Sequence, residues 1–457
     1  MMAMKAEAVI CGAGIAGVSA AYTLAVEKGL QGILLVDQGA PLSLTSDHST
    51  ECYRNWWPGP GDAMVALMNR SIERLQGLAR QSGNTFRLNR RGYLYCTASP
   101  QRAAEMQRDG EQISALGAGP LRLHRGRPGD PLYQPVHPED FEQQPDGADL
   151  LLDPALIQRH FPYLTPDVVA ALHVRRAGWF SAQQLGMLLL EQAKNRGVRF
   201  VSGQVTGVRQ ASGRVTAVQL ADGEQIETPV FINAAGPHLR PVGRLLGVEL
   251  PVFNELHLKL AMRDTHCVLD RSAPLVIWSD PQRLDWSAEE QEYLREEAGT
   301  QMLLGELPAG IHTRPDGGPG SPIILVLWEY RTRRVEPVWP IDEDALYPEV
   351  VLRGLARMIP GMRTYLQKAG KPRLDGGYYT KTRENRPLVG KLPIEGAFVI
   401  GALSGFGLMA ACGASELLAE HVTGGPLPPY AGAFSLERYH DQAYLAQLEA
   451  WGVSGQL

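Results

Sequence analysis

The chain has 457 residues, 44% of them hydrophobic and 20% charged, with a formal net charge of −5. This length supplies about two to three domains with buried cores. Because the small negative charge is spread along the chain, we expect neither nucleic acid nor an anionic membrane as the main partner. Five scattered cysteines, none in a CxxC pair, argue against a disulfide framework and a metal site and favour a reducing, cytoplasmic location.

Residues 8–26 carry no charge and approach the length of a membrane-spanning helix. A cluster of three glycines, the polar Ser19 and Thr23, and charged residues just before the segment argue against a span or a signal peptide. A short strand followed by a buried helix explains the same composition. We therefore expect no transmembrane segment.

The N-terminal region predicts a β-α-β unit, with a strand over residues 8–11, a helix over 14–27 and a strand over 32–36. Asp62 is placed to cap a further helix, and residues 92–97 predict the next strand. The apolar face of the helix after Asp62 consists of Met64, Leu67, Met68, Ile72, Leu75 and Leu78.

A stretch rich in Gly, Pro, Asp and Gln, residues 110–147, predicts a loop excursion. A second α/β block follows, with a helix over 182–195 and strands over 198–201 and 230–233. A last block has a strand over 397–400, then a glycine-rich turn and a helix of small residues. Turns between strands are predicted at Ser212-Gly213, Asp222-Gly223, Asp316-Gly317-Gly318 and Pro319-Gly320.

Rossmann-type segments thus recur at the start, middle and end of the chain, with β-rich segments between them. We predict a mixed α/β fold in which one cofactor-binding domain is assembled from distant segments and a substrate domain is interleaved with it. The expected cofactor domain takes residues 1–90, 150–250 and 370–430, the substrate domain 91–149 and 251–369, and a C-terminal tail 431–457.

Residues 12–17 read GAGIAG and fit the GxGxxG fingerprint of a dinucleotide site. They follow a predicted strand and open a predicted helix, so the helix N-terminus would face the negative phosphates. Asp37 follows the last glycine by 20 residues, at the end of the second strand, where a carboxylate can bind both ribose hydroxyls. That carboxylate would repel a 2′-phosphate, so NADP is disfavoured at this site.

Small-residue turns at three remote places favour FAD over NAD. They lie at residues 234–236, 376–377 and 404–407, where the backbone could approach a large ligand closely. One long cofactor that reaches a second domain accounts for all three turns. Taken singly, each turn could be an ordinary glycine loop in a chain with 49 glycines.

With these stretches the sequence resembles the D-amino-acid oxidase and sarcosine oxidase superfamily of flavoproteins over nearly its whole length. The resemblance rests on residues 11–23 with Asp37, on 198–208, on 231–237 (FINAAGP) and on 377–413, which is the most specific and is most similar to monomeric sarcosine oxidases. It implies the p-hydroxybenzoate hydroxylase type of fold, in which a Rossmann-type FAD-binding domain meets the antiparallel sheet of the substrate domain.

The resemblance also implies which positions hold FAD. Thr50 would touch the flavin side, Val205 would offer backbone contacts to adenine, and the turn after Leu403 would border the ring and ribityl chain. The full expected set is Gly12, Gly14, Ile15, Ala16, Gly17, Asp37, Gln38, Thr45, Ser46, Thr50, Val205, Ala235, Gly236, Leu403, Ser404, Gly405, Phe406, Gly407, Leu408 and Met409. Each of these has a purely structural alternative, and Val205 in particular fits a core position.

Several positions depart from the sarcosine oxidase pattern. Gly377 stands where that family attaches its flavin to a cysteine, so we expect non-covalent FAD. Met409 replaces a lysine that helps to hold the substrate carboxylate, and Phe406 replaces a histidine. An arginine pair of that family becomes Glu51 and Arg54 here, and in a loose alignment Leu327 replaces a lysine linked to oxygen activation. The cofactor site therefore matches better than the substrate site.

Arg54 is the candidate for binding a substrate carboxylate, because a guanidinium matches a carboxylate with two hydrogen bonds. The alternative is a structural salt bridge, for instance with Glu51. Trp56 and Trp57 could wall the pocket or pack in the core. Tyr330 and Arg331 are further catalytic candidates, from the strand that aligns with the catalytic strand of sarcosine oxidases. We expect His257 to be a satisfied core histidine rather than a base.

These observations predict oxidation of the C–N bond of a small amine or amino acid, by hydride transfer to the flavin and hydrolysis of the resulting imine. The acceptor can be O2, which makes the chain an oxidase, or a quinone or electron-carrier protein, which makes it a dehydrogenase. Two alternatives stay open: an NAD(P)H-dependent flavin hydroxylase on the same fold, and a flavin-binding subunit that acts within a larger complex. The oligomeric state does not follow from the sequence.

Overall fold

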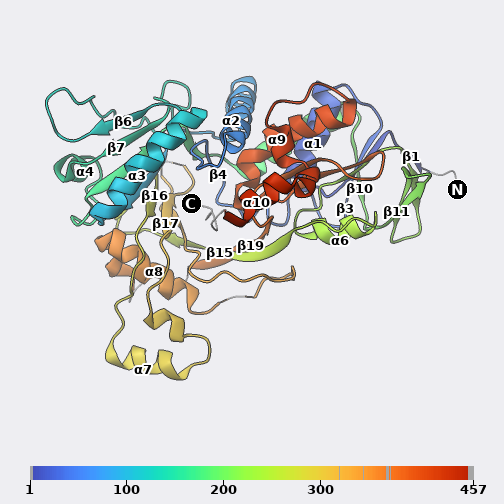
Figure 1. Ribbon diagram of the computed structural model, residues 1–457. Helices are drawn as coiled ribbons and strands as arrows, with labels where there is room; N and C mark the ends of the chain where they lie inside the picture. The colour runs from blue at the N-terminus through green and yellow to red at the C-terminus, as the bar shows by residue number, and fades with distance from the viewer. Residues whose placement is uncertain (1–3, 319, 343, 367–369, 371, 451–457) are drawn as a thin grey trace.

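The computed structural model describes residues 4–318, 320–342, 344–366, 370 and 372–450. Pro319 of one predicted turn, and the last seven residues of the predicted tail 431–457, lie outside these ranges. Figure 1 shows two parts side by side, joined by the long strands β15 and β19 (Phe253–Arg263 and Arg373–Lys381) that run along the bottom of the main body.

A six-stranded sheet forms the centre of the first part. Its strands come from the three separated segments that the sequence marks as Rossmann-like, and the first five are parallel. Phe231 pairs with both Val9 and Ala397, so distant segments meet in one sheet. In spatial order the strands are β10 (Arg199–Ser202), β3 (Ile33–Asp37), β2 (Ala8–Cys11), β14 (Phe231–Asn233), β21 (Ala397–Gly401) and the antiparallel β20 (Leu388–Lys391).

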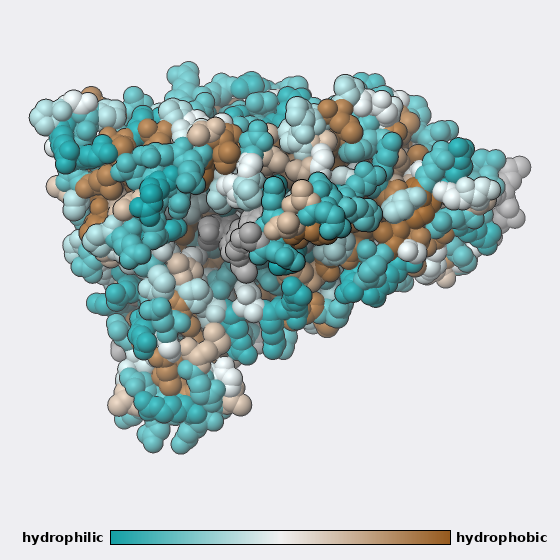
Figure 2. Space-filling view, in the orientation of Figure 1, coloured by the Kyte–Doolittle hydropathy of each residue, from teal (hydrophilic) through white to brown (hydrophobic). Residues whose placement is uncertain are grey.

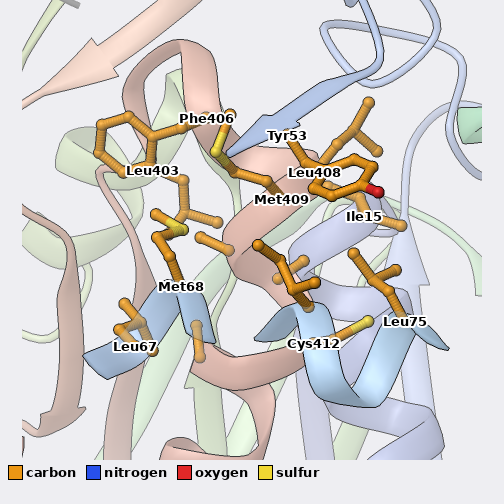
Figure 3. Packing of buried hydrophobic residues seen from close by; sticks show 14 of the residues in the cluster. Ile15, Tyr53, Leu67, Met68, Leu75, Leu403, Phe406, Leu408, Met409 and Cys412 are labelled. Carbon is orange, nitrogen blue, oxygen red and sulfur yellow. The ribbon is translucent and has the colours of Figure 1, made fainter. Parts of the chain in front are cut away.

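Helices cover this sheet. α1 (Ile15–Tyr22) continues as the π-helical η1 (Thr23–Glu27), and α9 (Gly407–Thr423) lies between α1 and α2 (Ala63–Ser82), as Figure 3 shows at close range. The predicted apolar face of α2 is buried in full. Asp62 stands at the N-cap of α2, but its side chain makes no capping hydrogen bond because its backbone is helical, with φ −95° and ψ −3°. The helix therefore begins where the sequence predicts, but the prediction that the Asp62 side chain caps it is wrong.

A four-stranded sheet, β1-β13-β12-β11, lies beside the six-stranded sheet, near β3 and β10 (Figure 1). Ser212 and Gly213 form the two-residue turn between β11 and β12, with φ of 51° and 76°, as a tight hairpin requires. Next along the chain, η3 (Gly236–His238) leads into α6 (Leu239–Arg244). The strands are β1 (Met4–Lys5), β13 (Gln225–Glu227), β12 (Arg214–Leu220) and β11 (Val205–Ala211).

A nine-stranded sheet dominates the second part. It is mostly antiparallel, with parallel pairs at β5–β16 and β6–β7. The division into two domains stays a prediction, but β8 and β19 lie in this sheet, although the predicted boundaries gave them to the cofactor domain. In spatial order the strands are β19, β15, β18 (Ile323–Leu327), β17 (His312–Pro315), β16 (Leu275–Trp278), β5 (Tyr93–Thr97), β8 (Ala170–Val174), β7 (Ala148–Leu151) and β6 (Leu121–His124).

The predicted loop 110–147 is partly regular. It holds the end of α3 (Pro100–Ile113), the π-helical η2 (Ser114–Ala118) and the edge strand β6. Ser99 caps α3 by accepting a hydrogen bond from the N–H of Arg102. The sequence predicts the end of this helix as loop because its few apolar residues are widely spaced in a polar sequence. Residues 125–147, all described, form turns without a helix or strand.

The remaining elements lie around the two sheets. A two-stranded sheet pairs β4 (Cys52–Arg54) with β9 (Ala177–Trp179), and α5 (Ala182–Asn195) has the bounds that the sequence predicts. Polar residues cover most of the visible surface, including the lobe around α7 (Figure 2). The other helices are α4 (Pro154–His160), α7 (Ala288–Glu296), η4 (Gln301–Leu304), α8 (Tyr347–Met358), η5 (Pro360–Tyr365), η6 (Ser404–Phe406), η7 (Ala431–Phe434), η8 (Leu436–His440) and α10 (Gln442–Ala450). Among the described residues, no helix combines the length and the apolar composition that a membrane crossing needs.

Candidate active site

An elongated cavity of about 510 Å³ opens at the carboxyl ends of β2, β3, β14 and β21. This is the edge of a parallel sheet where α/β proteins bind nucleotides. The cavity continues past the start of α9 to the backbone of β19 in the nine-stranded sheet, where Tyr378 and Thr380 line it. A long ligand in this cavity would therefore reach from one part of the molecule to the other.

The glycine-rich turn after β2 has no room for side chains. Gly12 has φ +109°, and a Cβ atom there would stand 2.4 Å from the carbonyl oxygen of Ala234. A Cβ on Gly17 would stand 1.8 Å from the carbonyl oxygen of Gly12, so this glycine allows α1 to pack on the turn. The two glycines bring the backbone of the turn and the N-terminus of α1 to the wall of the cavity.

Two side chains hold this turn in place. The Asp37 carboxylate accepts hydrogen bonds from the backbone N–H of Ala13 at 2.7 Å and of Gly39 at 2.8 Å. Each carboxylate oxygen keeps a further lone pair, so Asp37 can still bind ribose hydroxyls. The Ser46 hydroxyl accepts from the N–H of Ile15 at 3.0 Å, at the first turn of α1.

The predicted cofactor residues divide into two groups. Those that line the cavity are Gly12, Gly14, Ile15, Ala16, Asp37, Gln38, Thr45, Ser46, Val205, Ala235, Gly236, Leu403, Ser404 and Gly407. The others lie outside the lining: Gly17 packs under the turn, and the Thr50 carbonyl accepts two hydrogen bonds from Arg314.

Gly405, Phe406, Leu408 and Met409 also lie outside the lining. Phe406, Leu408 and Met409 are buried in the core cluster drawn in Figure 3, which also contains Met68 of α2. Because α9 begins at Gly407, its helical period turns Leu408 and Met409 away from the cavity.

Further lining residues are not in the expected FAD-binding set, although the resemblance already covers the stretches 198–208 and 231–237. They come from the start of β11, from the segment over η3 and α6, and from the loop after β3. These positions form no nucleotide-binding motif of their own, so their place at the edge of the parallel sheet is the signal that points to them. They are Gly203, Gln204, Thr206, Pro237, His238, Pro241, Val242, Leu245, Ala40, Leu42, Ser43 and Leu44.

The nine-stranded sheet has an apolar outer face and a polar inner face. Alternation along each strand separates them. Outer-face residues, which join the core beneath α8, include Leu94, Cys96, Leu260, Met262, Val276, Trp278, Ile324 and Val326. Residues of the opposite face, called the inner face below, include Tyr93, Tyr95, His257, Lys259, His312, Arg314, Leu327 and Tyr379.

The inner face meets the loop that lines the cofactor cavity. The Lys259 ammonium donates to the carbonyls of His48 and Ser49 at 2.9 and 3.1 Å. The Thr45 hydroxyl donates to the carbonyl of Tyr378 at 3.2 Å. Because Thr45 lines the cavity and the next residues bind the inner face, the two surfaces adjoin.

His257 lies on the inner face between two carboxylates. Its Nδ1 is 2.8 Å from Glu329 Oε1, its Nε2 is 3.2 Å from Glu255 Oε2, and its ring stacks on Tyr379 at 3.9 Å between centroids. Burial alone would lower the pKa of His257, but the charges of Glu329 and Glu255 outweigh burial and raise it. Both ring nitrogens thus lie beside carboxylates, but the short contact of Nδ1 with Glu329 lacks hydrogen-bond geometry, so the ring is paired by charge rather than fully hydrogen-bonded as a satisfied core histidine would be.

Arg54 is buried on β4, across from the inner face. Its guanidinium lies over the ring of Trp57 at 4.3 Å and near that of Tyr93 at 5.6 Å, and its Nε donates to the carbonyl of Trp56. Trp57 in turn packs edge-on against Phe406, next to the turn that lines the cavity. Glu51, the alternative partner, lies 3.3 Å from Arg314 and accepts from the N–H of Ala182.

Tyr330 and Arg331 do not join this group. Tyr330 packs in the outer-face core against Tyr347, with its hydroxyl 3.4 Å from Asp344. Arg331 is exposed. Both line a second cavity of about 250 Å³, which lies where the chain beyond β18 separates from β15.

Comparison with known proteins places these features in a family. The family described as FAD dependent oxidoreductase (DAO) matches residues 7–421. Two mouse (Mus musculus) mitochondrial proteins are each 23% identical over 95% of the chain: the pyruvate dehydrogenase phosphatase regulatory subunit, of which the chain covers 43%, and sarcosine dehydrogenase, of which it covers 41%. The chain thus spans less than half the length of these curated relatives.

Solved structures share the fold. L-proline dehydrogenase from P. horikoshii superposes with a TM-score of 0.72 and 18% identity, covering 96% of this chain and 99% of that one. Glycine oxidase from Geobacillus kaustophilus gives a TM-score of 0.71 and 15% identity, covering 95% and 98%. These structures confirm the mixed α/β fold, and the family match over residues 7–421 confirms the superfamily that the sequence resembles.

The residues of the cavity fit FAD, the cofactor of this family. The backbone of the glycine-rich turn is bare at the cavity wall, and Asp37 retains acceptor capacity. At the far end the Ser404 hydroxyl is buried and has no hydrogen-bond partner among the described residues. A buried unpaired hydroxyl is costly unless a ligand satisfies it, so this atom also indicates a polar ligand.

Proposed function

Because the chain belongs to the family of FAD dependent oxidoreductases, we propose that it oxidises the C–N bond of a small amine or amino acid. The observation that carries this proposal is the junction of two surfaces. The cofactor cavity adjoins an inner face with aromatic and ionisable side chains, and Arg54 lies on the opposing wall. When bound there, FAD supplies the capacity to accept a hydride from the carbon next to the amine nitrogen.

The relatives support this substrate class. By their names, sarcosine dehydrogenase, L-proline dehydrogenase and glycine oxidase act on small amino acids. In this chain Arg54 would pair with a substrate carboxylate, and its contact with Trp57 fixes the plane of the guanidinium. Tyr95, His312 and Tyr379 would form the opposing wall, on which the substrate lies.

We propose that FAD is bound without a covalent link at Gly377, because a glycine there offers no side chain for attachment. The electron acceptor would be O2, or a quinone or carrier protein. Leu327 and Met409 are buried and apolar where the resemblance places lysines. Because the lysine at the position of Leu327 is the one linked to oxygen activation, a dehydrogenase is as well supported as an oxidase. Reoxidation of the reduced protein by air at the turnover rate, in stopped flow, would exclude the dehydrogenase.

An anaerobic screen of secondary amines and amino acids tests the proposal. The purified yellow protein is mixed with each compound while flavin absorbance is followed near its visible maximum. We expect bleaching by at least one small amine or amino acid. A flavin that none of them bleaches would contradict the proposed activity.

A second candidate is a flavin-binding subunit that acts through a partner. The relative named as a pyruvate dehydrogenase phosphatase regulatory subunit, and the two missing lysines, favour it. A yellow protein that no amine bleaches, and that consumes no NAD(P)H on mixing, would support this candidate. All five cysteines are free in the structure, which supports a reducing location such as the cytoplasm for either candidate.

A further inference from the structure

Four charged side chains form a chain along the edge of the inner face. The Lys381 ammonium lies 2.7 Å from Glu255, Glu255 contacts His257 Nε2, and His257 Nδ1 contacts Glu329. Burial of a histidine cation is costly unless it is paired, and here both ring nitrogens face carboxylates. Glu255 is engaged from two sides, whereas the contact that holds Glu329 comes from His257 alone among the ion pairs of the described residues.

Glu329 is also the most exposed member of this chain, with 27% of its side chain exposed against 16% for Glu255 and 13% for Lys381. The pairing of β15 with β18 runs from Arg263–Ile323 to Leu260–Val326 and then stops. Just beyond the Leu260–Val326 pair, the Tyr347 hydroxyl bridges the two segments in place of the backbone hydrogen bonds of the sheet, because it donates to the carbonyl of Leu258 and accepts from the N–H of Trp328. The two strands part there, and the second cavity of about 250 Å³ fills the gap.

This second cavity connects the inner face with solvent. Its inner end is lined by His257, which is buried, and by Glu329, whose side chain is 27% exposed. Its outer end is lined by Arg331, Thr332 and Arg333, which are exposed. The Glu329 carboxylate thus touches the inner face through His257 and the surface through the cavity.

Amine oxidation requires such a path for a proton. A small aliphatic amine has a pKa of about 10, like that of lysine, so at neutral pH it arrives as an ammonium ion. The ammonium nitrogen has no lone pair, so it must lose a proton before the adjacent C–H bond can give up a hydride. An enclosed site therefore needs a base that touches the substrate and can release the proton to water.

We propose that Glu329 is this base and that His257 is the residue that positions it. The inference rests on the proposed amine oxidation. The N–H bond of the ammonium breaks, an O–H bond forms on the Glu329 carboxylate, and the electron pair stays on nitrogen. Burial raises the pKa of Glu329, but the charges of His257 and Lys381 outweigh burial and hold that pKa below its usual range. Glu329 therefore carries the proton only transiently and passes it at once to water in the second cavity, which makes the uphill transfer irreversible and restores the carboxylate.

Other ionisable groups near Glu329 are already engaged. His312 on β17 has its Nδ1 2.8 Å from the carbonyl of Gly310, and burial lowers its pKa. Asp344 accepts from the N–H of Leu346 and lies near the Tyr330 hydroxyl. The charged and titratable groups that face the Glu329–His257 pair are Glu255, Tyr379, Lys381, His312, Arg331, Arg333, Asp342, Asp344 and Tyr347.

The test compares Glu329→Gln with Glu416→Gln as a matched control. Glu416 is also a half-buried carboxylate in an ion pair, 23% exposed beside Arg70, but it lies outside both cavities. The rate of anaerobic flavin reduction is measured from pH 6 to pH 10 with an amine that bleaches the wild type. We expect flavin reduction in Glu329→Gln to be about 100-fold slower than in the wild type at pH 7. Its rate should approach the wild-type rate as the pH rises towards the pKa of the free amine. Glu416→Gln should keep the wild-type rate at every pH. Glu329→Asp should restore part of the loss at pH 7.

A second readout does not depend on turnover. In protein labelled with 13C at the histidine ring, the His257 signal is titrated in the wild type and in Glu329→Gln. We expect the pKa of His257 to fall in the variant, because the carboxylate that favours its cation is gone. An unchanged His257 titration would overturn the pairing of His257 with Glu329, and with it the proposed transfer of the proton from the amine through Glu329 to water, called the relay below.

The outcomes separate the two proposals. If amines bleach the wild type and Glu329→Gln keeps the wild-type pH profile, the relay is wrong and the proposed activity stands. If no amine bleaches the wild type, the proposed activity fails and the relay fails with it. A loss at pH 7 that persists unchanged at pH 10 would mean that Glu329 supports the structure of the site, and would also overturn the relay.

Discussion

Gly12 and Ala234 touch across two turns of the parallel sheet: a Cβ on Gly12 would stand 2.4 Å from the carbonyl oxygen of Ala234. The turns follow β2 and β14, which are neighbours in the sheet although they lie far apart in the sequence. Real Cβ atoms do not approach backbone oxygens so closely. The first glycine of the fingerprint is therefore needed for the junction of the two segments as much as for the approach of a phosphate.

Gly12→Ala should lower the amount of bound flavin at least about tenfold, because the new methyl group must push the two turns apart and the backbone must also hold φ +109°. Gly223→Ala is the matched control, since Gly223 also has a positive φ, +87°, but open space around it. The flavin-to-protein absorbance ratio of the purified variants measures the effect. Equal flavin content in the two variants would contradict the role given to the Gly12–Ala234 contact.

Asp37→Asn should weaken FAD binding by about 10- to 100-fold. The carboxylate accepts two backbone hydrogen bonds and offers further lone pairs to the ribose, and charged hydrogen bonds contribute about 1.5–3 kcal/mol each. Titration of apoprotein with FAD, followed by quenching of flavin fluorescence, gives the dissociation constant. Asp222→Asn alters a similar carboxylate–backbone bond in an exposed turn and should bind FAD as the wild type does.

Arg54→Met should discriminate between substrates by charge. We expect flavin reduction by an amino acid to slow by about 10- to 100-fold in its second-order rate constant, since a charged hydrogen-bonding partner of the carboxylate is lost. An amine without a carboxylate should change little. Arg90→Met removes another buried arginine, which pairs with Asp146 away from the cavities, and controls for lost stability. Equal losses for both substrate types would argue that Arg54 is structural.

His173 should make the protein less stable as the pH falls. Burial and the nearby Arg175 lower its pKa to about 3, and its Nδ1 faces two donors, the Tyr133 hydroxyl and Arg175, so the folded protein keeps the ring neutral. Between pH 6.5 and 3 the unfolded chain binds a proton that the folded chain does not, so stability falls as pH decreases, by at most about 1.4 kcal/mol per pH unit from this group.

Urea unfolding of the wild type and of His173→Gln at several pH values between 7.5 and 5 checks this expectation. Glutamine cannot titrate, so the variant should lose less stability on acidification than the wild type does. Parallel curves for the two proteins would show that His173 gains its proton equally in both states.

The sequence predicts best where local signals agree with the fold. The strand–glycine turn–helix of residues 8–27, the helix α5 and the Ser212-Gly213 hairpin each have a pattern of their own, and the structure confirms them. The nine-stranded sheet has no such signal, because β5 pairs with β16 at a separation of 182 residues, as in the pair Tyr93–Leu275. Pairing of this kind depends on tertiary contacts that no window of sequence contains.

The site shows the same limit. The GxGxxG turn and Asp37 are recognisable because phosphate and ribose impose their spacing. Glu329 and His257 are 72 positions apart and meet because one strand ends early and the next continues. Tyr330 precedes Arg331 in the segment that the resemblance marked, yet the alternation of side chains directs Tyr330 to the outer face and leaves Glu329 beside His257.

Release of flavin by acid tests the central claim most directly. The purified protein is precipitated with trichloroacetic acid, and FAD in the supernatant is quantified by chromatography against the protein concentration. If one FAD lies non-covalently in the cavity between the glycine-rich turn and the nine-stranded sheet, close to one FAD per chain appears in the supernatant. A colourless protein that takes up no FAD on reconstitution, or a flavin that stays with the precipitate, would contradict this account.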